Sequence, residues 1–154
     1  MLLGISFCAL LAVVTVTDLE RRVIPNRALA VAAVAAIAIV AVGDPAALPE
    51  RLIAAFAGGG SLLMLALARP HGLGMGDAKL VATMGLFLGR TSVVAVLVAF
   101  AGGALAGAML IVRDGAAART RSLPFAPFLA AGGLVGLCAG GEILHWYAAS
   151  MIGR

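Results

Sequence analysis

Six apolar runs dominate the chain, and short polar segments separate them. They cover residues 2–17, 28–42, 52–68, 78–88, 92–112 and 124–152. A helix that crosses a hydrocarbon core needs about 20 apolar residues, and several of these runs approach that length. The pattern therefore predicts an all-α polytopic membrane protein with about six transmembrane helices, organised as one membrane-embedded domain over residues 1–154.

Composition strengthens this prediction and excludes other classes. Hydrophobic residues make up 63% of the chain and charged residues only 12%, whereas soluble domains carry about a quarter charged residues. The chain lacks the alternating pattern and aromatic girdles of a porin-like barrel. The net charge is +4, but the basic residues are scattered in short gaps. The expected surroundings are therefore a lipid bilayer, and no nucleic-acid partner is expected.

The loop charges predict an orientation. With six spans, eight basic residues fall on one side and three on the other, and the richer side is expected to be cytoplasmic. The first group is Arg21, Arg22, Arg27, Arg69, Lys79, Arg113, Arg119 and Arg121, and the second is Arg51, Arg90 and Arg154. Both termini are then non-cytoplasmic.

The fourth run is about half a span long, which leaves a five-span alternative. In that version the fourth and fifth runs merge through Gly89, Arg90 and Thr91. The last basic loop would then move outside and Arg90 would lie within the membrane, so six spans fit the charges better.

Asp18 and Asp77 stand out among the acidic residues, because each lies where a span meets the predicted cytoplasmic face. Glu142 lies inside the last run, where a buried hydrogen bond or an interfacial position is expected. The remaining acids are expected to be solvated or paired with nearby charges: Glu20, Asp44, Glu50 and Asp114.

Asp18 and Asp77 have the chemistry of a general acid and base pair. Two close carboxylates in a low-dielectric site do not both ionise easily, so one holds a proton. Such a pair can activate water and protonate a leaving amine. Neither a metal nor a cofactor is required, and the isolated His71 and His145 form no zinc ligand set with the cysteines.

Glycines suggest further local structure. Gly72, Gly74 and Gly76 precede Asp77, which predicts positive φ angles, close backbone approach and Asp77 as a helix N-cap. Other glycines at four-residue spacing predict close helix contacts: Gly85 and Gly89, Gly103 and Gly107, and Gly132, Gly136 and Gly140. Cys8 and Cys138, each within an apolar run, are expected to be small buried residues.

Three segments resemble the type IV prepilin peptidase family. Residues 18–26 resemble its Asp-x5-Ile-Pro-Asn signature, and residues 74–80 resemble its Gly-x-Gly-Asp-x-Lys-Leu signature. Residues 123–130 are similar to the Pro-Phe-x-Pro-Phe segment that opens the family's last helix. Two signatures that each supply one aspartate are more specific than either alone.

The resemblance implies an intramembrane aspartyl endopeptidase of the bacterial inner membrane with Asp18 and Asp77 as its catalytic pair. It implies cleavage of the short basic leader from prepilins or pseudopilins at the cytoplasmic face. Site-shaping or substrate-binding roles are expected for Gly74, Gly76, Pro25 and Lys79, the last by orienting a carboxylate or by pairing with a phospholipid.

The chain departs from the larger bifunctional members of that family. They carry an insertion with paired Cys-x-x-Cys motifs and an N-methyltransferase activity, and this sequence contains no such cysteines. It therefore resembles the form without that activity. Two other functions remain open, a small proton-coupled transporter and a non-catalytic assembly protein of a pilus or secretion system. Transporter sites usually lie near the bilayer midplane between repeats, a placement that does not match Asp18 and Asp77.

Overall fold

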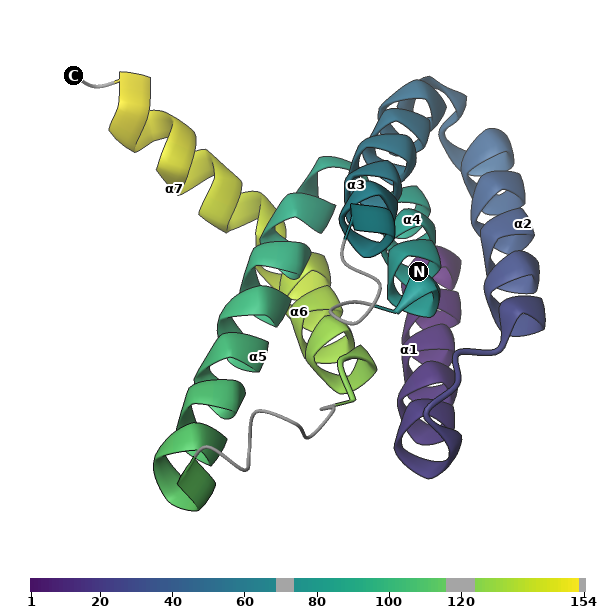
Figure 1. Cartoon of the computed structure of the whole chain (residues 1–154). Helices are drawn as coiled ribbons and strands as arrows, with labels where there is room; N and C mark the ends of the chain where they lie inside the picture. Colours follow the sequence, from purple (N-terminus) through teal and green to yellow (C-terminus); the bar gives the residue numbers. More distant parts are fainter. Residues whose placement is uncertain (69–73, 116–123, 153–154) are drawn as a thin grey trace.

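The computed structural model describes residues 1–68, 74–115 and 124–152, which form seven α-helices and two 3-10 turns (Figure 1). Helices satisfy every backbone hydrogen bond within one segment, as a lipid environment demands. The predicted all-α class is confirmed. The elements are α1 (Leu2–Arg21), α2 (Asn26–Gly43), η1 (Pro45–Ala47), α3 (Leu48–Ala68), α4 (Met75–Leu88), η2 (Gly89–Thr91), α5 (Ser92–Asp114), α6 (Ala126–Cys138) and α7 (Gly140–Ile152).

Four described stretches are long and apolar enough to cross a membrane, and the bent pair α6 and α7 makes a fifth if it is one span. One of the four, Met75–Asp114, contains both α4 and α5. The η2 turn separates these two helices, which run in different directions (Figure 1). The fourth and fifth apolar runs therefore do not merge into one α-helix. The number of about six transmembrane helices stays a prediction.

The last apolar run is not one helix, which corrects the sequence prediction. α6 ends at Cys138, α7 begins at Gly140, and the two axes are bent by 72°. Two consecutive glycines weaken the helix at this point. A Cβ on Gly140 would lie 2.7 Å from Cβ of Thr91, so the η2 turn packs directly against the break. Glu142 consequently lies exposed in the first turn of α7, which projects from the bundle (Figure 1).

Glycines bring two pairs of helices into close contact, as their spacing predicted. A Cβ on Gly85 of α4 would lie 2.5 Å from the backbone nitrogen of Ala55 of α3. On α6, a Cβ on Gly136 would lie 2.9 Å from Cβ of Ala95 on α5. The expectation is wrong for Gly107, which has open space beside it. Small residues thus set the α3–α4 and α5–α6 contacts.

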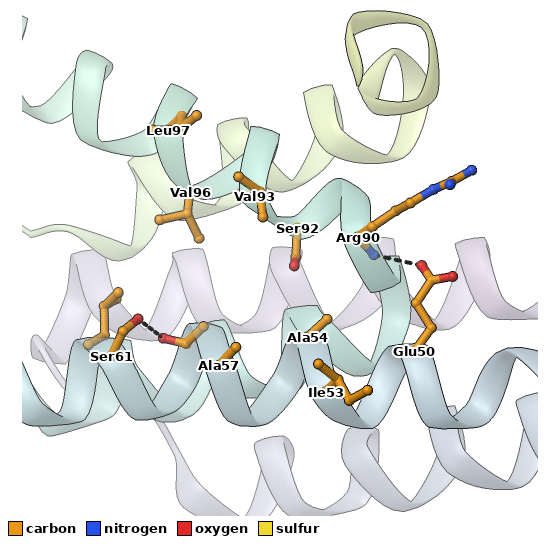
Figure 2. A pocket seen from close by; sticks show the side chains of 12 residues that line it. Glu50, Ile53, Ala54, Ala57, Ser61, Arg90, Ser92, Val93, Val96 and Leu97 are labelled. Carbon is orange, nitrogen blue, oxygen red and sulfur yellow. Dashed lines mark hydrogen bonds between the residues drawn. The ribbon is translucent and has the colours of Figure 1, made fainter. Parts of the chain in front are cut away.

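A groove of about 460 Å³ lies between α3 and α5 (Figure 2). Its walls are largely apolar, with Ile53 and Ala57 on α3 and Val93 and Leu97 on α5. Glu50 and Arg90 lie together at one end of it. The groove therefore has an apolar length and one charged end.

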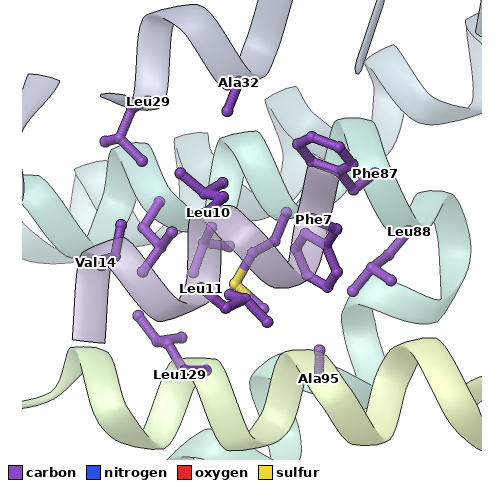
Figure 3. Packing of buried hydrophobic residues seen from close by; sticks show 14 of the residues in the cluster. Phe7, Leu10, Leu11, Val14, Leu29, Ala32, Phe87, Leu88, Ala95 and Leu129 are labelled. Atoms are coloured by element: carbon purple, nitrogen blue, oxygen red, sulfur yellow. The ribbon is translucent and has the colours of Figure 1, made fainter. Parts of the chain in front are cut away.

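The core of the bundle surrounds α4. Nine residues of this helix are buried, on all of its sides. Phe7 of α1 packs on Phe87 of α4 with ring centroids 5.1 Å apart, and Leu129 of α6 closes the cluster (Figure 3). Because residues on every side of α4 are buried, other helices surround it. This environment explains how a run of only 14 residues is accommodated: other helices, rather than lipid, cover much of α4.

Both cysteines are free and exposed, so the expectation that they are buried is wrong. An apolar run identifies a membrane helix but does not tell which of its faces meets protein, because lipid-facing positions are apolar too. Cys8 and Cys138 lie on such outward faces.

Candidate active site

Asp18 lies in the last turn of α1 and is buried, with 8% of its surface exposed. The helix ends three residues later because Arg22 adopts a left-handed conformation (φ 51°), and its N–H donates to the Asp18 carbonyl at 2.9 Å. The side chain of Asp18 points to a different partner. Its Oδ2 accepts a hydrogen bond from the N–H of Ala126, the first residue of α6, at 3.3 Å. Two helices, α1 and α6, therefore meet at this acid.

Asp77 lies at the third position of α4, and not at the N-cap as expected. Gly74 is the N-cap, and its N–H donates to Oδ2 of Asp77 at 3.2 Å. A carboxylate at this position reaches back to a backbone donor that the helix leaves unpaired. Each of the two acids thus has one oxygen held by a main-chain N–H.

The structure brings Asp18 and Asp77 into one cavity of about 310 Å³. The walls come from the end of α1, the segment before α2 and the first turn of α4: Asp18, Arg22, Val23, Ile24, Asn26, Gly74, Met75, Gly76, Asp77 and Lys79. The prediction that two acids 59 positions apart meet in the fold (77 minus 18) is confirmed at the level of a shared cavity.

The glycines beside Asp77 provide space and not positive φ angles. Gly74 has a φ of −74°, and among the described glycines only Gly89 and Gly115 have positive φ. A Cβ on Gly76 would lie 3.1 Å from Cβ of Ile24, closer than most real contacts. Gly76 therefore lets the segment before α2 lie directly against α4. Gly72 lies outside the described residues.

Lys79 donates from Nζ to Oδ1 of Asn26 at 3.1 Å. This contact joins the first turn of α4 to the first turn of α2 at the edge of the cavity. Pro25 is the N-cap of α2, and its carbonyl accepts the N–H of Ala28 at 3.0 Å. The roles expected for Lys79 were to orient a carboxylate or to pair with a phospholipid. Its contact with Asn26 was not predicted.

The other candidate residues lie elsewhere or outside the described chain. Glu142 and His145 are exposed on α7, and His71 falls outside the described residues. Glu50 is exposed as expected, but it also accepts the N–H of Arg90 at 3.0 Å. Asp114 forms an ion pair with Arg113 at 3.9 Å, as expected for an acid in a basic segment. Across the described ranges, no three His, Cys, Asp or Glu side chains are grouped closely enough to hold a metal ion.

Sequence reasoning did not identify Arg22, Val23 and Ala126 as residues of this site. Their motifs were visible, because Arg22 and Val23 lie within residues 18–26 and Ala126 within residues 123–130. What the motifs did not show is that the start of α6 supplies a backbone donor to Asp18.

A model of the type IV leader peptidase family matches residues 5–112. This is more than half of the chain and includes both acids of the cavity. The chain belongs to the type IV leader peptidase family. The resemblance that the two aspartate segments suggested is thereby confirmed.

A curated relative agrees with the family assignment. The chain is 33% identical over 152 residues to the prepilin leader peptidase/N-methyltransferase of Bacillus subtilis (strain 168). The match covers 97% of this chain and 60% of the relative. The chain therefore spans less than two thirds of the length of that relative. No solved structure matches the chain significantly.

Proposed function

We propose that this chain is an aspartic-type endopeptidase that removes the short basic leader from type IV prepilins or pseudopilins. The observation that carries the proposal is the cavity lined by both Asp18 and Asp77 in a member of the leader peptidase family. The name of the Bacillus subtilis relative, prepilin leader peptidase/N-methyltransferase, supports the substrate class.

The geometry supports a mechanism with two carboxylates and one water. One carboxylate takes a proton from the water as its oxygen attacks the scissile carbonyl carbon, and the other carboxyl donates its proton to the carbonyl oxygen. Proton transfer to the amide nitrogen then lets the peptide bond break and the amine leave. The backbone donors at Gly74 and Ala126 each hold one oxygen of an acid. The two side chains therefore lose less conformational freedom when they reach the reactive geometry.

The surroundings of the pair suit an extended peptide. Gly74 is exposed and presents backbone without a side chain beside Asp77, so a substrate strand would meet little steric hindrance there. Gly76 shapes the site indirectly, because it lets Ile24 pack against α4. Pro25 and Lys79 act indirectly in this proposal, since Pro25 starts α2 and Lys79 ties that helix to α4. The site lies at the helix ends that the loop charges assign to the cytoplasmic face of the bacterial inner membrane.

The test is cleavage of a prepilin by the purified chain in detergent or liposomes, with EDTA present and no nucleotide added. Asp18→Asn and Asp77→Asn keep the side-chain volume but remove the shared proton, and each is expected to lower the rate about 10²- to 10⁴-fold. Asp44→Asn, an exposed acid at the end of α2, is the matched control and should cleave like the wild type.

Two results would reject the proposal. The first is cleavage by Asp18→Asn or Asp77→Asn at more than half of the wild-type rate. The second is a wild-type chain that binds a panel of prepilins but cleaves none of them, the outcome expected for a non-catalytic assembly protein.

A further inference from the structure

The charged end of the groove between α3 and α5 lies at the opposite end of α4 from the candidate active site. Asp77 is the third residue of α4, whereas Arg90 at the charged end of the groove lies two residues beyond Leu88, the last residue of that helix. The helix from Asp77 to Leu88 spans about 17 Å at ~1.5 Å per residue. A headgroup bound at Glu50 and Arg90 would therefore be separate from the peptide that meets the two aspartates.

The walls of the groove offer few polar groups. Ile53 and Leu97 are exposed to 68% and 64%, so both present apolar surface that no other part of the described chain covers. Ser61 lines the groove as well, but its hydroxyl donates to the carbonyl of Gly58 in its own helix at 2.9 Å. A concave apolar surface of this size between two membrane helices suits one hydrocarbon chain.

The charged end carries two opposite charges that do not neutralise each other. Glu50 accepts the backbone N–H of Arg90 through Oε1, while the Arg90 guanidinium extends away from that carboxylate (Figure 2). Within the described residues, neither side chain forms an ion pair. The neighbouring cation is already used, since Arg51 donates to the carbonyls of Leu86 and Phe87 at the end of α4.

We propose that this groove binds a membrane phospholipid with a phosphoethanolamine headgroup. The lipid phosphate would pair with the Arg90 guanidinium, its ammonium with the Glu50 carboxylate, and one acyl chain would lie along Ile53, Ala57 and Leu97. A guanidinium is a strong phosphate ligand, and a primary ammonium donates hydrogen bonds to a carboxylate. A phosphatidylglycerol headgroup has no cation for Glu50, and the quaternary ammonium of phosphatidylcholine has no N–H to donate.

Native mass spectrometry of the full chain in detergent tests this, with phosphatidylethanolamine, phosphatidylglycerol or phosphatidylcholine of identical acyl chains added in turn. We expect phosphatidylethanolamine to bind about threefold more tightly than the other two, the scale of an exposed charge pair. Glu50→Gln keeps an acceptor for the Arg90 N–H but should remove the preference over phosphatidylglycerol. Arg90→Gln should weaken all three lipids by a similar factor.

Ala57→Leu fills the middle of the groove and should weaken all three lipids without changing their order. Asp44→Asn and Ala38→Leu, exposed positions on α2, are the matched controls and should bind like the wild type. Equal binding of the three headgroups, or unchanged binding by Glu50→Gln and Arg90→Gln, overturns the proposal. A dimer that Ala57→Leu dissociates would also overturn it, because a second copy would then be the occupant.

Discussion

The two ends of α4 carry similar hydrogen bonds in different settings. At one end Asp77 accepts the N–H of Gly74, and at the other Glu50 accepts the N–H of Arg90. Glu50 is exposed, whereas Asp77 shares a cavity with the buried Asp18. A carboxylate bonded to a backbone donor is therefore no sign of catalysis by itself. The second acid and the protein around the pair make the first end chemically distinct.

Changing the length of each acid by one methylene should give the largest difference in cleavage rate between the two ends of α4. Asp77→Glu moves its carboxylate outward by one methylene, and a displacement of about 1 Å can lower a rate about 10²-fold. Glu50→Asp, the matched change at the other end, should alter cleavage by less than about twofold because it lies outside the chemistry. Initial rates of prepilin cleavage at equal enzyme concentration measure both. A rate for Asp77→Glu above a tenth of the wild type would contradict the distinction.

The middle of α4 holds the two ends in register through its contact with α3. Gly85→Ala places a methyl group against the backbone of Ala55, so we expect the free energy of unfolding to fall by about 1–3 kcal/mol. Gly107→Ala on α5, where the space is open, should leave it unchanged or slightly raised. Unfolding in mixed micelles measures the difference. Equal stability of the two variants would show that the close approach does not matter.

The contact between Gly76 and Ile24 lies at the end of α4 that carries Asp77 and the candidate active site. Gly76→Ala should press on Ile24 and lower cleavage about tenfold, while Gly60→Ala in open space should not. Removing the obstacle tests the cause, so Gly76→Ala combined with Ile24→Ala should cleave faster than Gly76→Ala alone. A double variant slower than either single variant would rule out this steric explanation.

The hydrogen bond between Lys79 and Asn26 should have the smallest effect. Lys79→Met and Asn26→Ala each remove an exposed bond, which we expect to lower cleavage about threefold. Because both changes remove the same contact, the double variant should be no slower than the slower single variant. Losses that multiply would mean that Lys79 acts on another group.

Much of this molecule follows from its sequence. The first five apolar runs each correspond to one α-helix, because a helix pairs its backbone polar groups internally, as a lipid environment demands. The glycines at positions 85 and 136 predicted two close helix contacts, because small residues allow helix backbones to approach each other. The pairing of Asp18 with Asp77 also followed, since both close or open a helix on one predicted face.

Other features depend on packing that no local pattern encodes. The bend at Ala139 arises where Gly140 meets Thr91 from another helix. The outward positions of Cys8 and Cys138 depend on which helix face meets protein. The left-handed Arg22 and the contact between Lys79 and Asn26 are set by the geometry between α1, α2 and α4. The position of Asp77 within α4 was missed for the same reason. Asp77 is the third residue of the helix, and no local pattern showed that the helix starts at Met75.

The proposed function requires Asp18 and Asp77 to act as one unit on one peptide bond. Single-turnover cleavage of a prepilin by Asp18→Asn, Asp77→Asn and the double variant tests this directly. Residues that act as a unit lose their effect together, so the double variant should retain the same residual rate as either single variant, within about threefold. Losses that multiply in the double variant, or a single variant near the wild-type rate, would contradict the claim.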